Sequence, residues 1–256
     1  MSMRSQERRA LLLEALGAGE IDVDEAAARL KVSASTVRRD LQHLSATRAV
    51  RRTYGGAILA SHPPETTLTE RMAVNGAGKR AIARAALDLV EDGDTLILDA
   101  GSTVAAFGQL LTRRRLRIIT NNLALLPFLA EAPGLDLVVL GGTLRATSMS
   151  TVGPLALEAM RLMTADRAFL GADGVVAGRG LCEASLDQVT LKTLMMRQAR
   201  EVIVLADAGK LGRAEQTAWA PLPRAWTLVT DAPGPKEQLR RLTEAGARIR
   251  VAPGEG

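Results

Sequence analysis

The sequence Val32-Ser-Ala-Ser-Thr-Val-Arg-Arg-Asp-Leu-Gln-His-Leu44 predicts a helix with one apolar and one polar face. Ser33 suits the N-cap position, because its hydroxyl can accept a hydrogen bond from a backbone N–H one turn further on. Apolar side chains recur at i, i+4 and i+7, which places them on one stripe: Val37, Leu41 and Leu44. The opposite face carries a hydroxyl, two guanidinium groups and an amide: Ser35, Arg38, Arg39 and Gln42. These groups hydrogen-bond phosphates and base edges in a DNA major groove, although any surface helix shows a polar face.

The residues around this helix favour the DNA-binding interpretation. A periodic apolar segment covers residues 8–16, and Asp22 is an acidic cap for a second helix that runs to about Leu30. Two short helices joined by so tight a turn form a helix-turn-helix, whose second helix enters the groove. Residues 47–58 predict a hairpin with Arg51 and Arg52 beside it, a basic wing. We therefore expect a DNA-binding domain over residues 1–60, with these contacts to DNA: Ser35, Thr36, Arg38, Arg39, Gln42, Arg51 and Arg52.

Composition limits the class of protein. The chain has 256 residues, enough for a second domain, and a formal net charge of +5 with a sequence pI near 10.0, which suits a polyanionic partner. Its one cysteine, Cys182, cannot form an intrachain disulfide, so we expect a reducing compartment. No apolar run approaches the ~18 residues of a membrane span, and no signal-peptide core is visible. We expect a cytoplasmic protein without metal or cofactor.

The rest of the chain predicts a second domain after a linker. Two prolines mark residues 61–70 as the linker, and residues 71–256 form the second domain. Short apolar runs alternate there with helical segments, and we expect strands at 95–98, 116–119, 135–140, 167–170, 202–205, 227–230 and 247–251. This alternation is typical of an α/β domain, a mostly parallel sheet with helices on both faces.

Polar loops follow five of these strands. Ligands of such sheets bind outside the carboxyl ends of the strands. The first loop, residues 99–103, combines a glycine, two hydroxyls and the N-terminus of a helix, which suits a phosphate. The other loops start at Thr120, Gly141, Gly171 and Asp207 and add amide, carboxylate and lysine groups. The set predicts a polyhydroxy, phosphorylated small molecule. Neither G-x-G-x-x-G nor G-x-x-x-x-G-K-[ST] occurs, which disfavours dinucleotides and nucleoside triphosphates.

These motifs together resemble the DeoR family of bacterial transcriptional regulators. The N-terminal match is Val32-Ser33, residues 36–41 and Tyr54-Gly-Gly-Ala57. The C-terminal match comprises Arg71, Lys79, Ile82-Ala83, residues 99–103, Thr120-Asn121, Gly141-Gly142, Asp166, Gly171, Gly180-Leu181, Lys192, residues 205–207, Lys210 and Thr230-Asp231. The resemblance implies a winged helix-turn-helix before a sensor domain similar to ribose-phosphate isomerases. It further implies a repressor of a carbohydrate operon, acting on double-stranded operator DNA as a dimer or tetramer and relieved by a phosphorylated sugar.

The resemblance and the loops give one set of expected effector-binding residues: Asp99, Gly101, Ser102, Thr103, Thr120, Asn121, Gly141, Gly142, Arg145, Asp173, Lys192 and Lys210. Many relatives have a glutamate four residues before the lysine, where this chain has Gln188, which leaves the charge of that corner open. The related isomerases have three carboxylates in a run that here reads Leu170-Gly-Ala-Asp-Gly174. We therefore expect no enzymatic activity; the alternative is a sugar-phosphate isomerase or deaminase fused to a DNA-binding module. An activator in place of a repressor, and the identity of the sugar, remain open.

Overall fold

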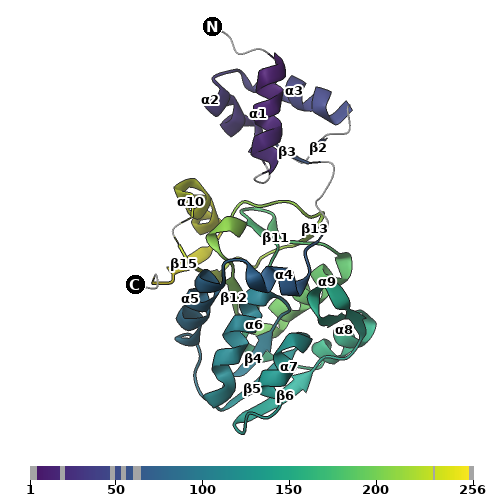
Figure 1. The fold of residues 1–256 in the computed structure, drawn as a ribbon, viewed down its shortest axis with the longest axis vertical. Helices are drawn as coiled ribbons and strands as arrows, with labels where there is room; N and C mark the ends of the chain where they lie inside the picture. The colour runs from purple at the N-terminus through teal and green to yellow at the C-terminus, as the bar shows by residue number, and fades with distance from the viewer. Residues whose placement is uncertain are drawn as a thin grey trace.

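The N-terminal part of the chain consists of three helices and a small antiparallel sheet. The computed structural model describes residues 5–17, 21–46, 50–52, 56–59, 65–232 and 234–253. The first elements are α1 (Ser5–Gly17), β1 (Ile21–Asp22), α2 (Val23–Leu30), α3 (Ala34–Ala46), β2 (Val50–Arg52) and β3 (Gly56–Leu59). The strand order is β1-β3-β2, and both pairs are antiparallel. The expected three helices and hairpin are therefore confirmed for the described residues (Figure 1).

Local hydrogen bonds explain where the helices of this part begin. The Asp22 carboxylate accepts from the backbone N–H groups of Asp24 and Glu25 at 2.9 and 3.1 Å, which caps α2. The Ser33 hydroxyl accepts from the N–H of Thr36 at 3.2 Å and caps α3 as predicted. Between them, Lys31 adopts a left-handed conformation with φ of 54°, which turns the chain sharply from α2 into α3.

The larger part of the chain is built on a seven-stranded sheet in which every pair of neighbours is parallel. Its strands are β4 (Thr95–Leu98), β5 (Leu116–Thr120), β6 (Leu135–Val139), β9 (Ala165–Leu170), β12 (Ala199–Leu205), β14 (Trp226–Thr230) and β15 (Ala247–Val251). All seven coincide with the strands expected from the sequence. The α/β class is confirmed.

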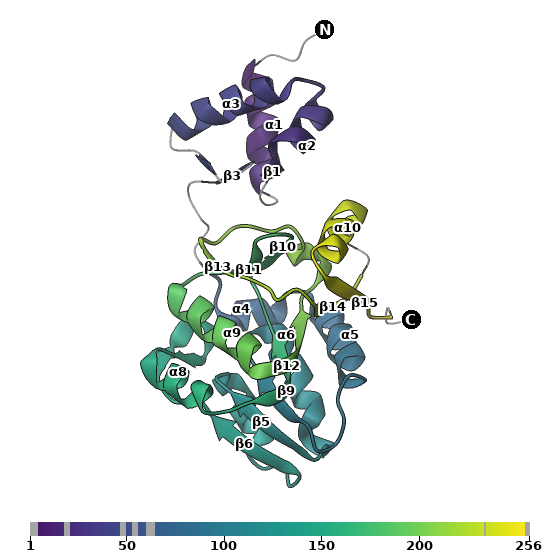
Figure 2. The same ribbon diagram turned by 180° about the vertical axis from the view of Figure 1, so that it is seen from behind.

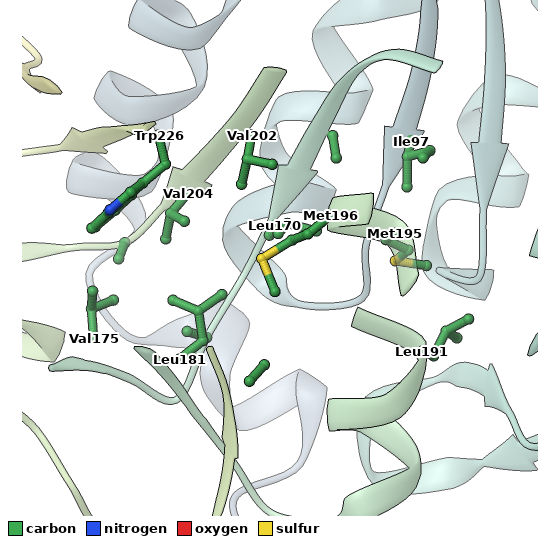
Figure 3. Packing of buried hydrophobic residues seen from close by; sticks show 14 of the residues in the cluster. Ile97, Leu170, Val175, Leu181, Leu191, Met195, Met196, Val202, Val204 and Trp226 are labelled. Atoms are coloured by element: carbon green, nitrogen blue, oxygen red, sulfur yellow. The ribbon is translucent and has the colours of Figure 1, made fainter. Parts of the chain in front are cut away.

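Helices cover both faces of this sheet, as Figures 1 and 2 show from opposite sides. One layer is formed by α5 (Gly76–Leu87), α6 (Ser102–Gly108) and α7 (Leu126–Leu129), and the other by α8 (Pro154–Arg161), α9 (Leu186–Gln198) and α10 (Lys236–Glu244). Successive strand residues alternate between the two layers, because side chains of a strand point to opposite faces. Thus Leu96 and Leu98 pack with α5 and α6, whereas Ile97 packs with α8 and α9. Figure 3 shows the core between the sheet and the layer of α8 and α9, where Met195 lies between Ile97 and Leu191.

The strand order places a crevice beside the middle strand. From β4 the chain proceeds to β5 and β6 on one side and then returns to β9 on the other side. Loops that leave β4 and β9 therefore diverge, and open α/β sheets bind ligands at such a switch point. The two loops are residues 99–101 and 171–173.

Short elements surround this crevice. The segment expected to be a linker ends in a helix, α4 (Leu68–Ala73), which Thr67 caps together with Glu70. Two small antiparallel sheets, absent from the sequence prediction, consist of β7 (Thr143–Arg145) with β8 (Ser150–Val152), and of β10 (Gly174–Val176), β11 (Gly180–Glu183) and β13 (Ala218–Ala220). The short 3-10 helices are η1 (Gln109–Arg113), η2 (Leu123–Leu125), η3 (Ala146–Ser148) and η4 (Ala208–Lys210). In the part of the chain that the structure describes, no helix is long and apolar enough to span a bilayer.

Candidate functional site: an exposed helix face and a polar crevice

The polar face of α3 is open to solvent. Its exposed side chains are Ser35, Arg38, Arg39 and Gln42, while Thr36 is half-buried. The apolar stripe lies underneath, with Val37 and Leu41 fully buried. Arg51 and Arg52 lie on β2, and their side chains fall outside what the structure describes.

A buried ion pair fixes α3 against α1. Arg8 of α1 donates through Nε to Asp40 of α3 at 2.5 Å, and both side chains are less than a tenth exposed. Arg9 adds a second contact to the same carboxylate at 3.4 Å. Because Asp40 points inward while Arg38 and Arg39 point outward, the pair orients the exposed face of α3.

The crevice at the switch point is a polar cleft that opens into a wider cavity. The cleft is lined by Arg71, residues 99–103, Asn121, Ser148, Ser150, residues 171–173, Glu183, Gln188, Leu191, Lys192 and Lys210. The wider cavity has a volume of about 450 Å³ and shares Arg71, Ser102, Asp173 and Lys210 with the cleft. Pockets for small ligands have ~300–1,000 Å³, so the combined space accommodates a sugar phosphate.

The loop after β4 has the geometry of an anion cradle. Gly101 precedes α6 with φ of 125°, a conformation that favours glycine, and Ser102 and Thr103 open the helix. The side-chain amide of Asn122 donates to the carbonyls of Asp99 at 3.2 Å and Gly101 at 3.4 Å and so holds the loop. The hydroxyl of Thr103 is buried without a partner in the structure. A free hydroxyl beside free helix N–H groups suits a phosphate.

A buried lysine, Lys79, and a half-buried one, Lys210, lie next to this loop and lack full compensation by carboxylates. Lys210 donates to the Ala172 carbonyl at 2.6 Å, and Lys79 to the Val74 carbonyl at 2.7 Å and to the Arg71 carbonyl. Burial, and then the positive charge of Lys210, lower the pKa of Lys79. Burial also lowers the pKa of Lys210, although Asp207 and Asp173 act in the opposite direction. An anion bound between them would relieve both effects.

The other side of the cleft is acidic. Lys192, buried at 3% exposure, pairs with Asp99, donates to the Gly171 carbonyl at 2.6 Å and lies 2.8 Å from the Glu183 carboxylate. One ammonium thus serves two buried carboxylates. Burial raises the pKa of Glu183 to about 7, opposed by Lys192 and supported by Asp173 and Asp99. The uncharged Gln188 accepts a hydrogen bond from the Ser185 hydroxyl at 3.1 Å. The negative charge in this part of the cleft therefore comes from Glu183 rather than from position 188.

Several polar atoms that face the cleft have no hydrogen-bond partner in the structure. Among the residues lining it, the unpartnered acceptors are Asn121 Oδ1, Asp173 Oδ2 and Glu183 Oε1, and the unpartnered donors are Nε and Nη2 of Arg71. Glu183 Oε1 has the Lys192 ammonium nearby without hydrogen-bond geometry. Buried polar groups are nearly always satisfied, so this concentration of exceptions indicates a place for a polar ligand.

Eight of the expected effector-binding residues line the cleft: Asp99, Gly101, Ser102, Thr103, Asn121, Asp173, Lys192 and Lys210. Four line neither it nor the wider cavity. Thr120 is fully buried and supports the loop by donating to the Leu98 carbonyl at 2.6 Å. Gly141 and Gly142 form the exposed turn into β7. Arg145 pairs with Glu65, whose side chain is 11% exposed. The effector prediction omitted Arg71, Ser148, Ser150 and Glu183, which line the cleft.

The carboxylates of the cleft change the argument about enzymatic activity. The sequence around Asp173 suggested one carboxylate, but the fold brings Asp99 and Glu183 to the same cleft. The carboxylate count therefore no longer separates a binding protein from an enzyme. Burial raises the pKa of the Cys182 thiol to about 12, so this residue is no nucleophile at neutral pH. Within the described ranges, no group of three His, Cys, Asp or Glu side chains is placed to hold a metal ion.

Comparison with known proteins identifies both parts of the chain. Residues 8–62 match the DeoR-like helix-turn-helix domain, and residues 74–232 match the DeoR C-terminal sensor domain. The HTH-type transcriptional repressor GlcR of Bacillus subtilis (strain 168) is 33% identical over 90% of this chain and 89% of its own. The glycerol-3-phosphate regulon repressor of Escherichia coli (strain K12) is 30% identical over 88% and 90%. A solved ribose 5-phosphate isomerase of Methanocaldococcus jannaschii covers 52% of each chain at 24% identity with a TM-score of 0.38. The chain belongs to the DeoR family of helix-turn-helix transcriptional regulators.

Proposed function

We propose that the protein represses a carbohydrate operon and that a phosphorylated sugar, bound in the crevice, relieves the repression. The relatives are named as repressors, one of them of a glycerol-3-phosphate regulon. The observation that carries the proposal is the loop of residues 99–103 beside the two undercompensated lysines, Lys79 and Lys210. An anionic ligand with further polar groups matches this environment.

Operator DNA is the second partner. In this proposal Ser35, Thr36, Arg38, Arg39 and Gln42 of α3 meet the major groove, and Arg51 and Arg52 of the wing contact adjacent phosphates. The exposure of the α3 face supports the assignment. The protein acts in the cytoplasm, where its operator lies.

A homo-oligomer completes the proposal, because helix-turn-helix proteins bind repeated half-sites as dimers or multiples of them. Leu155 near the start of α8 and Leu162, its C-cap residue, are 71% and 87% exposed, and Leu186 at the start of α9 is 74% exposed. Large exposed apolar side chains on adjacent helices are typical of a contact between subunits.

Ligand binding tests the proposal directly. We expect one or more sugar phosphates, but not the corresponding free sugars, to raise the melting temperature of the full chain. A ligand at 100 times its Kd stabilises the folded state by about 2.7 kcal/mol. Ser102→Ala and Lys210→Ala should abolish the shift, whereas the exposed Thr190→Ala on α9 should keep it. Bound ligand should also lower the affinity for DNA fragments that the protein selects from a random pool.

Two results would contradict the proposal. One is a melting temperature that responds to free sugars or nucleotides and to no phosphorylated sugar. The other is a phosphorylated sugar that binds in the crevice but leaves the affinity for the selected DNA unchanged, since a ligand acts only through a difference in affinity between two states.

A further inference from the structure

Glu183 is the one carboxylate of the cleft, among the described residues, that combines near-complete burial with an oxygen, Oε1, whose one polar contact in the structure is the shared Lys192 ammonium at 2.8 Å, outside hydrogen-bond geometry. Its side chain is 5% exposed, and it lines the narrow cleft without lining the wider cavity. Asp99, by comparison, accepts from Lys192 and from the Gly171 N–H at 3.3 Å. Asp173 is bound by Arg71 at 3.1 Å and keeps one oxygen unpartnered. Glu183 therefore has hydrogen-bonding capacity that the protein does not use.

The two spaces of the crevice differ in their chemistry. Lys79 and Arg213 line only the wider cavity, together with several carboxylates, and the acceptors of Asn121 and Glu183 line only the cleft, whereas Arg71, Asp173 and Lys210 line both. Ser102 lines both spaces and marks their junction. A ligand with its phosphate near Ser102 and Lys210 would point its other end into the cleft. With a volume of about 30 Å³, the cleft has room for roughly two hydroxyl-sized groups.

We propose that Glu183 is a specificity-determining residue of the effector site and accepts hydrogen bonds from donor groups at the end of the ligand remote from its phosphate. This inference rests on the proposed function of the crevice and narrows its ligand to a phosphorylated sugar with hydroxyl or amino groups at that end. Such a ligand supplies donors next to Glu183, because the one ammonium that contacts Glu183, that of Lys192, is shared with Asp99. An analogue without these donors leaves the buried carboxylate without hydrogen bonds from the ligand and should therefore bind more weakly.

The test compares the full-length protein with Glu183→Gln, using isothermal titration calorimetry. Glutamine keeps the size of the side chain and removes its charge. The probes are inorganic phosphate, pentose 5-phosphates, hexose 6-phosphates, their deoxy analogues and 2-amino hexose 6-phosphates. We expect Glu183→Gln to bind inorganic phosphate like the wild type and to lose about 10- to 100-fold in affinity for the tightest-binding sugar phosphate. Glu158→Gln, on the exposed surface of α8, is the matched control and should change neither affinity.

The deoxy and amino compounds distinguish the two sources of donor groups. If hydroxyls are the donors, the deoxy analogue that lacks them binds the wild type about as weakly as the parent sugar phosphate binds Glu183→Gln. If an amine is the donor, the amino sugar phosphate binds the wild type more tightly than its hydroxyl counterpart, and the variant removes the difference. Either pattern supports Glu183 as the determinant.

The pH dependence supplies a readout that a purely structural role would not give. Glu183, facing Lys192, Asp99 and Asp173, has its pKa raised to about 7, and hydrogen bonds from a ligand favour its charged form. Wild-type affinity should therefore rise between pH 6 and pH 8, relative to Glu183→Gln. The phosphate group of the ligand itself titrates at about pH 6, but it does so equally with both proteins. The ratio of the two affinities therefore reports the ionisation of Glu183 alone.

The outcomes separate this inference from the proposed function. If neither inorganic phosphate nor any sugar phosphate binds the wild type, the effector site itself is wrong. If sugar phosphates bind no more tightly than inorganic phosphate, the cleft does not recognise donor groups. Equal affinities of wild type and Glu183→Gln for every compound, or an equal loss for phosphate and sugar phosphates, would overturn the role of Glu183 and leave the phosphate site intact.

Discussion

The side chains of Arg38 and Arg39 are exposed to solvent, whereas that of the next residue, Asp40, is buried. On a helix, successive residues are rotated by about 100°, so two arginines can face solvent while the next carboxylate is buried. Guanidinium groups in such exposed positions are free to bind either phosphates or guanine edges. Whether each arginine binds a phosphate or a guanine edge must therefore be tested one residue at a time.

The two arginines make a prediction for DNA binding. We expect Arg38→Ala and Arg39→Ala each to weaken operator binding, because each removes a charged donor from the groove. Removal of an arginine that reads a base costs ~1–3 kcal/mol of binding free energy and relaxes specificity at one position. Removal of an arginine that binds a phosphate lowers the affinity for all sequences alike and reduces the salt slope by ~1. Fluorescence anisotropy at several salt concentrations distinguishes the two, with the exposed Arg224→Ala in the sensor domain as the control. Unchanged affinity in both variants would show that another surface binds DNA.

Sequence reasoning at the residue level succeeded where a side chain belongs to a strand-end loop. Asp99, Ser102, Thr103 and Lys210 were expected in the crevice for this reason and lie there. It did not find Glu183, because the position of that side chain depends on how β11 pairs with β10 and β13. A local pattern of residues carries no information about such a pairing.

The helix α3 is held against α1 by a buried ion pair in addition to its apolar stripe. Asp40 is 5% exposed and is bound by Arg8 and Arg9 from α1, so removing its charge takes a buried carboxylate away from the guanidinium group of Arg8. Breaking a buried pair by changing one member costs ~3–5 kcal/mol. The whole recognition surface would then lose its support.

We accordingly expect Asp40→Asn to lower both the stability of the N-terminal domain and the affinity for operator DNA, while the sensor domain still binds its ligand. Thermal melts with and without ligand, together with DNA titrations, measure the two effects separately. The exposed Glu14→Gln on α1 serves as the control and should behave like the wild type. Full operator affinity in Asp40→Asn would show that the pair with Arg8 does not position α3.

The elements of the chain were predictable to different degrees. The seven parallel strands follow from short apolar runs bounded by helical segments, because buried strands such as β4 and β12 are apolar on both faces. The small sheets were missed, since β7, β8, β10 and β13 have only three residues each and show no usable alternation. They nevertheless supply Ser150 and Glu183 to the cleft.

At the scale of the whole molecule, a set of ion pairs connects the cleft with the segment that precedes α4. Glu65, directly before α4, is bound by Arg145 and lies 3.5 Å from Arg71, and Arg71 also binds Asp173 in the cleft. One guanidinium thus contacts both the effector site and the end of the interdomain segment. A ligand that engages Arg71 changes the balance of charges that holds Glu65.

This arrangement predicts a defect in signalling. We expect Glu65→Gln to bind effector with near wild-type affinity but to show a smaller effector-induced loss of operator affinity. Coupling between sites amounts to ~1–3 kcal/mol, a 5- to 150-fold change in affinity, so a several-fold reduction is measurable by DNA titration with and without effector. If the coupling is the same in Glu65→Gln and in the surface control Glu158→Gln, communication takes another route.

We also expect the pairing of Glu65 with Arg145 to affect the reach of the DNA-binding domain. While the pair holds, the connection from β3 ends at residue 65, and without it the connection ends at Thr67, the N-cap of α4. The residues gained, Glu65 and Thr66, add about 7 Å of extended chain. In the proposed dimer, half-sites one helical turn apart would be separated by ~34 Å, so we expect this one carboxylate in each protomer to affect about one fifth of that distance.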